Sequence, residues 1–157
     1  MTQLTSIGLN ITQSEALTKQ LNTLLSSYQI QYMNARGFHW NIKGRQFFEL
    51  HLKFEEIYND LLLKVDEVAE RILTLGGQPK HAYSEYMSLS NISEAQGISD
   101  GATAVNNLLA GFEQLISHQR IILAQASEAS DEGTASLMSD YIKEQEKLIW
   151  MLKAYLA

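Results

Sequence analysis

The stretch that decides the fold is QFFELHLKFEEIYNDLLLKVDEVAERILTL, residues 46–75. Apolar residues recur in it every three or four positions from Phe47 to Ile72, which is the period of an amphipathic α-helix. Gly76-Gly77 and then Pro79, the only proline of the chain, follow directly and predict that the helix ends there. We therefore expect one long helix, against which the rest of the chain must pack.

Three further segments show the same helical period of apolar residues. They cover residues 13–38, 100–127 and 134–156. Thr12 and Glu15 have the spacing of a capping box, in which each side chain bonds a free backbone N–H of the first turn. We therefore expect the first of these helices to begin at Gln13. The acidic pair Asp131-Glu132 suits the N-terminus of the last one.

The lengths of the connections predict how the four helices are arranged. Residues 41–44 and 128–133 are short links, so each joins two antiparallel neighbours. Residues 76–99 form a much longer link that can cross the whole bundle, and we expect a short helix within it at 84–89. The predicted fold is an all-α, ferritin-like four-helix bundle with one long crossover between its second and third helices, as a single domain over residues 1–157.

The composition is that of a globular protein. Hydrophobic residues make up 45% of the 157 residues and charged residues 19%. No apolar run approaches the roughly 20 residues that span a bilayer, and the N-terminus lacks the basic start and apolar stretch of a signal peptide. We therefore expect a cytoplasmic protein that does not enter membranes. Because the chain has no cysteine, disulfides, thiolate zinc sites and thiol nucleophiles are excluded.

Four candidate metal ligands lie on one face of the helix predicted over residues 46–75. His51 and Glu55 are four residues apart, and so are Asp66 and Glu70, which places each pair one turn apart on a shared face. His51 and Asp66, however, are separated by about 22 Å along the helix, a distance that no metal ion bridges. One copy of the chain therefore cannot assemble a site from all four side chains.

The positions of these residues are symmetric about a point in the middle of the helix. A two-fold axis there lays a second copy antiparallel, so that the histidine of one copy approaches Glu70 of the other and Glu55 approaches Asp66. Asn59 and Leu62, which lie on the same stripe, are related by the same axis. A patch that is complementary to itself is what an isologous dimer requires, so we predict that the site belongs to a dimer.

A fifth candidate ligand, His39, ends the first helix next to Trp40, and the link 41–44 can fold it back towards His51. Imidazole and carboxylate ligands without sulfur suit Fe(II), Mn(II) or Zn(II). None of the four histidines follows a glutamate by three positions, so the Glu-x-x-His motif of a di-iron centre within one bundle is absent. Such spacings also occur on the solvated faces of charged helices, so spacing alone leaves a surface role open.

Residues 36–79 resemble the Dps family of mini-ferritins (DNA-binding proteins from starved cells) in the run RGFHWNIKGRQFFELHLKFEEIYNDLLLKVDEVAERILTLGGQP. The specific pattern is His-Trp, a second histidine twelve residues after the first, an aspartate fifteen residues later and a glutamate four after that. Residues 131–156, DEGTASLMSDYIKEQEKLIWMLKAYL, are similar to the last helix of the family. The resemblance covers nearly the whole chain.

This resemblance implies a hollow shell of twelve subunits, a homo-oligomer built from two-fold dimers, with ferroxidase sites at the two-fold interfaces. On the family pattern His39 and His51 come from one subunit, and Asp66 and Glu70 come from its partner. Glu55 matches a position often occupied by aspartate, where it assists a second, weaker iron site. The longer side chain of glutamate keeps a ligand role while changing the geometry of that second site.

The implied reaction is the oxidation of two Fe(II) by hydrogen peroxide, or more slowly by dioxygen, with ferric mineral stored in the cavity. Trp40 matches an indole that lies near the iron and intercepts oxidising equivalents, and packing at the dimer interface suits it equally. Iron would enter through acidic three-fold pores, whose positions include Asp131 and Asp140, with Ser136 where many relatives have another aspartate. Zn(II) fits the same ligands and can substitute for iron.

Two other functions stay open beside an enzymatic iron store that protects against oxidative damage. One is a nucleoid DNA-binding protein in which metal binding is secondary. The net charge of −6 and the lack of Lys or Arg before Lys19 do not favour it, because direct DNA binding in the family tends to use basic tails. The other is a shell that sequesters metal without turnover, from which oxidation kinetics would distinguish the enzyme.

Overall fold

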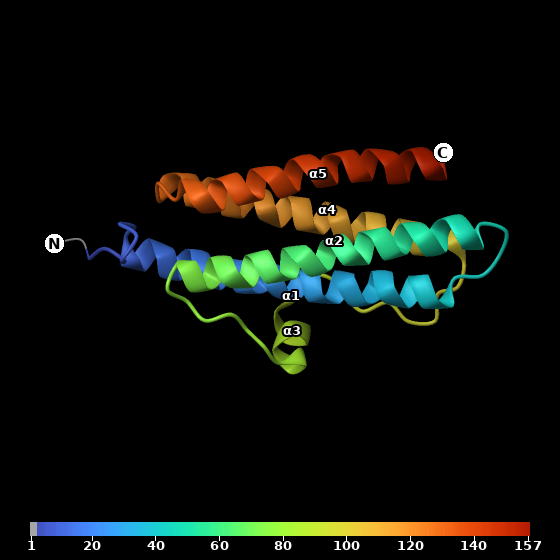
Figure 1. The fold of residues 1–157 in the computed structure, drawn as a ribbon, viewed down its shortest axis with the longest axis horizontal. Helices are drawn as coiled ribbons and strands as arrows, with labels where there is room; N and C mark the ends of the chain where they lie inside the picture. The colour runs from blue at the N-terminus through green and yellow to red at the C-terminus, as the bar shows by residue number, and fades with distance from the viewer. Residues whose placement is uncertain (1–2) are drawn as a thin grey trace.

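The computed structural model describes residues 3–157, in which five α-helices account for most of the chain (Figure 1). The helices are α1 (Ile11–Asn41), α2 (Phe47–Thr74), α3 (Tyr83–Leu89), α4 (Gly101–Glu128) and α5 (Glu132–Leu156). Within residues 3–157 no strand forms, and one isolated β-bridge joins Leu4 to Asn10. The all-α prediction is confirmed, and each predicted helix is present with its ends within three residues of the expected ones.

The helices form two antiparallel hairpins that pack side by side, α1 with α2 and α4 with α5 (Figure 1). The segment between α2 and α4 runs the length of the bundle and carries α3, which lies outside the four long helices against α1. At the far end, the backbone N–H of Lys43 donates to the carbonyl of Ser99 at 3.0 Å. The predicted crossover and its short helix are thus confirmed.

Buried polar side chains of α1 hold the crossover in place. Asn22 donates to the carbonyl of Gln78 at 3.1 Å and accepts from the backbone N–H of Lys80 at 2.8 Å. Asn34 makes the equivalent pair of bonds further along the crossover. Buried backbone groups of an irregular segment need hydrogen-bond partners. The two asparagine side chains supply such partners and so allow the crossover to pack against α1.

The predicted start of α1 was wrong. Asn10, in an extended conformation, accepts a hydrogen bond from the backbone N–H of Gln13 at 2.9 Å, so Asn10 is the N-cap and the helix begins at Ile11. Thr12 and Glu15 therefore both lie inside the helix and form no capping box. Both Asn and Thr can cap a helix by accepting from a free backbone N–H. The bridge between Leu4 and Asn10 places Asn10 at the position of the cap.

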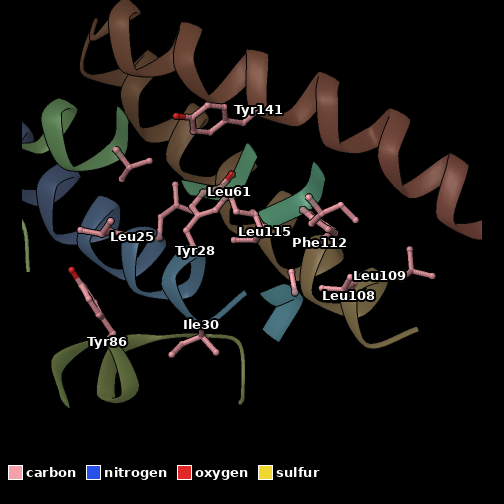
Figure 2. Packing of buried hydrophobic residues seen from close by; sticks show 14 of the residues in the cluster. Leu25, Tyr28, Ile30, Leu61, Tyr86, Leu108, Leu109, Phe112, Leu115 and Tyr141 are labelled. Atoms are coloured by element: carbon pink, nitrogen blue, oxygen red, sulfur yellow. The ribbon is translucent and has the colours of Figure 1, made fainter. Parts of the chain in front are cut away.

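The mainly apolar centre of the bundle contains one closed set of hydrogen bonds. Figure 2 shows Tyr28, Leu61 and Tyr141 among the side chains that converge there. The Tyr28 hydroxyl donates to Gln119, Gln119 donates to Gln145 at 2.8 Å, and Gln145 donates back to the Tyr28 hydroxyl at 2.7 Å. Burial raises the pKa of Tyr28 well above its usual range. Neutral side chains from α1, α4 and α5 therefore fill the middle of the bundle.

Candidate metal centre

His39 and His51 lie face to face where α1 and α2 meet. The short link after α1 turns the chain back, and the two imidazole rings stack with their centroids 3.7 Å apart and their planes at 14°. The Phe47 ring also stacks on His51, with a centroid distance of 5.0 Å. The structure thus brings together the two histidines that the predicted hairpin pointed to, and the His51 ring is stacked with two others.

Each of the two histidines is hydrogen-bonded to the backbone of the other. Nδ1 of His39 lies 2.6 Å from the carbonyl oxygen of His51, and Nδ1 of His51 lies 2.7 Å from the carbonyl oxygen of His39. A carbonyl only accepts, so each Nδ1 carries the proton. In the neutral rings both Nε2 atoms then have a free lone pair, which is the form of imidazole that binds metals.

Asp66 and Glu70 lie on the exposed face of α2, one turn apart. A hydrogen bond with Asp66, together with repulsion between the two negative charges, raises the pKa of the Glu70 carboxyl above its usual range. Such a pair is stabilised by any cation that binds between its oxygens, because the positive charge removes the repulsion. The arrangement is that of a carboxylate pair able to take part in a metal site.

The histidine pair and the carboxylate pair cannot meet within one chain. Along α2, Asp66 is about 22 Å from His51, since the helix rises about 1.5 Å per residue. In the part of the chain that the structure describes, residues 3–157, no group of three or more His, Asp or Glu side chains is placed to hold one ion. A site that uses both pairs needs side chains from a second copy.

The exposed face of α2 offers the surface that such a second copy would cover. Asn59 and Leu62 are both exposed, and Leu62 retains 49% of its accessible area. His51 and Glu55 are half-buried on the same stripe. Since residues of this stripe pair with one another under a two-fold axis, burying it against its own copy would join both ligand pairs at one interface.

Glu55 lies next to a side chain that sequence reasoning missed. The Tyr58 hydroxyl donates to Oε1 of Glu55 at 3.4 Å, and the Tyr58 ring packs edge-on against His39 with centroids 5.3 Å apart. Burial and the nearby Glu55 raise the pKa of Tyr58. The sequence places Tyr58 on the same helix face as His51, which it follows by seven residues, but spacing within α2 does not reveal the contact with His39.

Trp40 is 60% exposed, and its ring lies under the guanidinium of Arg36 at 5.1 Å. The same guanidinium lies over the rings of Tyr32 and Tyr58, at 5.7 Å and 5.3 Å. Cation–π attraction of this kind orients an aromatic ring without burying it. The side chain next to His39 in the sequence is therefore held by Arg36.

The two predicted pore residues lie in different surroundings. Asp131 is buried, accepts from Arg71 at 2.7 Å and caps α5 by accepting from the backbone N–H of Thr134 at 3.0 Å. Asp140 is exposed on α5. Of the two carboxylates only that of Asp140 faces solvent in the subunit, and a role of either residue in a pore stays a prediction.

Known proteins resemble this chain in both sequence and structure. The family model of the ferritin-like domain matches residues 14–157. The DNA protection during starvation protein of Porphyromonas gingivalis is 43% identical over 148 residues, which are 94% of this chain and 93% of that protein. The crystal structure of a Dps protein from Vibrio cholerae O1 has a TM-score of 0.97 and 55% identity, and covers 98% of this chain and 97% of that one. The chain belongs to the Dps family.

The Dps relatives include more distant ones with the same architecture. A Dps protein from Bacillus brevis has a TM-score of 0.90 at 32% identity, with 93% of this chain and 98% of that chain covered. The Vibrio structure is described as a member of a broad superfamily of ferritin-like diiron-carboxylate proteins. The ferritin-like fold predicted from helix lengths and the single crossover is thereby confirmed. No helix within residues 3–157 of this Dps chain is both long and apolar enough to cross a bilayer.

Proposed function

We propose that this Dps-family chain is a ferroxidase that oxidises Fe(II) with hydrogen peroxide at sites between two subunits and stores the ferric product inside a hollow, twelve-subunit shell. The observation that carries the proposal is the stacked pair of His39 and His51. Their crossed hydrogen bonds occupy both Nδ1 atoms and leave the Nε2 lone pair of each ring free. A merely structural pair of surface histidines has no need for both rings to be held in the metal-binding tautomer.

In the proposed site His39 and His51 of one subunit face Asp66 and Glu70 of the partner subunit. Glu55 would assist a second, weaker iron position. Nitrogen and carboxylate ligands accept Fe(II), and carboxylates bind Fe(III) still more strongly, so the ligand set favours oxidation as well as binding. The two imidazoles supply fixed lone pairs, and the two carboxylates supply negative charge.

The proposed reaction balances without releasing a radical. Two Fe(II) give one electron each to one hydrogen peroxide, which takes up two protons and becomes two water molecules. Zn(II) competes for the same ligands and cannot be oxidised, so it would act as an inhibitor. Iron is thus both substrate and stored product, and protection against oxidative damage in the cytoplasm follows from the removal of Fe(II) and peroxide together.

A mixing experiment tests the composition of the site. One variant carries His39→Ala and His51→Ala, and the other carries Asp66→Ala and Glu70→Ala. Each alone should lose peroxide-dependent iron oxidation, because every site lacks one half. Shells co-expressed from both should recover about one quarter of wild-type activity, because half of the random dimers are mixed and each of these has one intact site.

The outcome against the proposal is equally definite. If both variants retain activity, these side chains are not the ligands. If co-expressed shells of verified mixed composition stay as inactive as each variant alone, the two halves do not come from different subunits. A shell that takes up Fe(II) and never oxidises it would favour simple sequestration of metal.

A DNA-binding role has no comparable support in the described chain. Residues 3–10 contain no Lys or Arg and are folded back on themselves, with the backbone N–H of Thr5 donating to the carbonyl of Leu9 at 2.7 Å. Binding to a polyanion by an acidic chain needs a basic arm or patch. We therefore expect no shift of duplex DNA in a low-salt gel, and tight binding with a steep dependence on salt would overturn this expectation.

A further inference from the structure

One lysine is buried in the bundle between α2 and α5. The Lys64 side chain is 4% exposed, and its Nζ lies 2.7 Å from Oδ2 of Asp60 and 2.8 Å from Oε2 of Glu144. Asp60 lies one turn earlier on α2, and Glu144 comes from α5. Lysine is almost never buried unless it is paired with an opposite charge. One ammonium thus holds two carboxylates from two helices close together.

The groups around Lys64 hold it in the charged form. Its Nζ lies 5.1 Å from the centroid of the Tyr141 ring, whose negative face attracts a cation. The Tyr141 hydroxyl donates to Oε1 of Glu67 at 3.2 Å, which brings a third carboxylate to the same place. Burial by itself lowers the pKa of Lys64, but the hydrogen bonds to Asp60 and Glu144 outweigh it and raise the pKa above its usual range. The position therefore carries a positive charge at neutral pH.

Neutral side chains fill the core of the bundle next to this lysine. Tyr141 packs edge-on against Tyr28 with centroids 5.9 Å apart, and Tyr28 belongs to the closed set of hydrogen bonds with Gln119 and Gln145. Ferritin-like di-iron proteins instead build a metal site in the bundle core, from glutamates and histidines that project inward from facing helices. In this chain the core contributes amides and phenols, and the three nearby carboxylates already bind Lys64 or Tyr141.

We propose that Lys64 acts as a resident cation that closes the interior of the bundle to metal ions and so confines iron to the sites between subunits. The consequence for iron rests on the proposed ferroxidase function, whereas the exclusion of ions from the bundle does not. Carboxylate oxygens are the ligands that hard cations prefer, and two of them within 2.8 Å of one point would attract such an ion. With the ammonium at that point, an ion has to displace a positive charge that the chain itself supplies.

The experiment compares the assembled wild-type protein with Lys64→Met, which keeps the long apolar stem of the side chain and removes its charge. Terbium(III) is the probe, because it is a hard cation that binds carboxylates and emits light when a nearby tyrosine is excited. We expect Lys64→Met to bind about one additional Tb(III) per subunit, with new emission sensitised by Tyr141. Adding Glu144→Gln to this variant should remove the additional site.

Control variants separate the loss of this lysine from the loss of any positive charge. Lys64→Arg keeps a cation in the same place and should bind no more Tb(III) than the wild type. Lys53→Met removes an ammonium that pairs with Glu56 at 2.9 Å on an exposed part of α2, and it should open no further site. Glu144→Gln alone should leave the number of bound ions unchanged, because Lys64 already occupies that carboxylate, and this variant tests the proposal even if Lys64→Met does not fold.

Three results would overturn the inference. If Lys64→Met binds only as many Tb(III) ions as the wild type, the ammonium is not what keeps ions out. An additional ion in Lys64→Arg would show that the positive charge is not the cause. If Glu144→Gln alone removes a Tb(III) site, the carboxylates are open to ions while Lys64 is present. None of these results depends on iron oxidation, so a shell that oxidises no iron would overturn the proposed function and leave the exclusion of ions to be decided by terbium binding.

Discussion

The two ends of α2, which would carry the two halves of the proposed metal site, differ in how firmly their side chains are held. Near its start, the His51 ring stacks with the rings of Phe47 and His39, and both imidazoles have Nδ1 bonded to a backbone carbonyl. Towards its end, Asp66 and Glu70 are exposed, and the nearby Asp66 raises the pKa of Glu70. One half of the proposed site is organised within the subunit, and the other half is left open.

The difference follows from what each ligand requires. An imidazole binds metal only through a nitrogen that carries no proton, so its tautomer and ring plane have to be set before the metal arrives. A carboxylate accepts metal through either oxygen and in several geometries, and mainly its charge matters. The chain thus uses contacts between α1 and α2 where orientation counts and leaves flexible acidic side chains where charge is enough.

The largest effect is expected when the histidine end of α2 in one subunit can no longer meet the carboxylate end of α2 in its partner. Leu62→Arg places a charge at the middle of the self-complementary stripe, so we expect loss of the dimer and of peroxide-dependent iron oxidation together. Light scattering and an iron-oxidation assay measure the two quantities. Ile121→Arg, at a residue of α4 that is 58% exposed, is the control and should change neither. A monomeric Leu62→Arg protein with full activity would contradict an interface site.

The carboxylate end of α2 is anchored to α5 through one buried ion pair. Asp131→Ala leaves the Arg71 guanidinium unpaired and removes the cap of α5, so we expect the free energy of unfolding to fall by about 3 kcal/mol. Denaturation at a fixed protein concentration measures this. Asp140→Ala removes an exposed carboxylate and should have little effect on stability. Equal losses in both variants would show that burial of Asp131 is not the cause.

The histidine end should respond to the loss of one supporting ring. Phe47→Ala removes the ring stacked on His51, so we expect Fe(II) affinity to fall about tenfold while the protein stays assembled. Anaerobic titration calorimetry with Fe(II) measures the change. Phe48→Ala, at a neighbouring residue that is 84% exposed, is the matched control. An unchanged affinity in Phe47→Ala would mean that the crossed hydrogen bonds alone orient the imidazole.

The smallest effect concerns a histidine outside the site. Burial lowers the pKa of His118, so the unfolded chain takes up a proton at a higher pH than the folded one. The stability that comes from the neutral ring is therefore full above the unfolded pKa of about 6.5 and is lost as pH falls towards the folded pKa. His118→Gln should reduce the change in the free energy of unfolding between about pH 7 and pH 5. His81→Gln, at an exposed histidine, should leave the profile unchanged, and the reverse pattern would refute the assignment.

Much of the fold was predictable because it depends on local patterns. The period of apolar residues placed all four long helices, and the length of residues 76–99 predicted the crossover and α3. The start of α1 was missed, because the choice between Asn10 and Thr12 as cap depends on a backbone bridge to Leu4. A bridge between separate residues leaves no periodic signal.

The candidate site was likewise predictable from the sequence only in part. The spacing of His51, Glu55, Asp66 and Glu70 on one helix face follows from the α-helical repeat, and a site that used all four would need a second copy whatever the tertiary structure is. The contact between Tyr58 and His39 joins two helices, and so no spacing within either helix reveals it. This contact became visible only in the packed structure.

The sequence by itself determined the helices, the single crossover and the separation of two ligand pairs along α2, because these follow from the repeat of one helix and the length of the links. Only the tertiary structure decided that His39 and His51 stack and exchange hydrogen bonds. It also decided that Arg36 gathers three aromatic rings. The physical reason is that side-chain orientation and tautomer depend on contacts across helices, and a one-dimensional pattern does not contain those contacts.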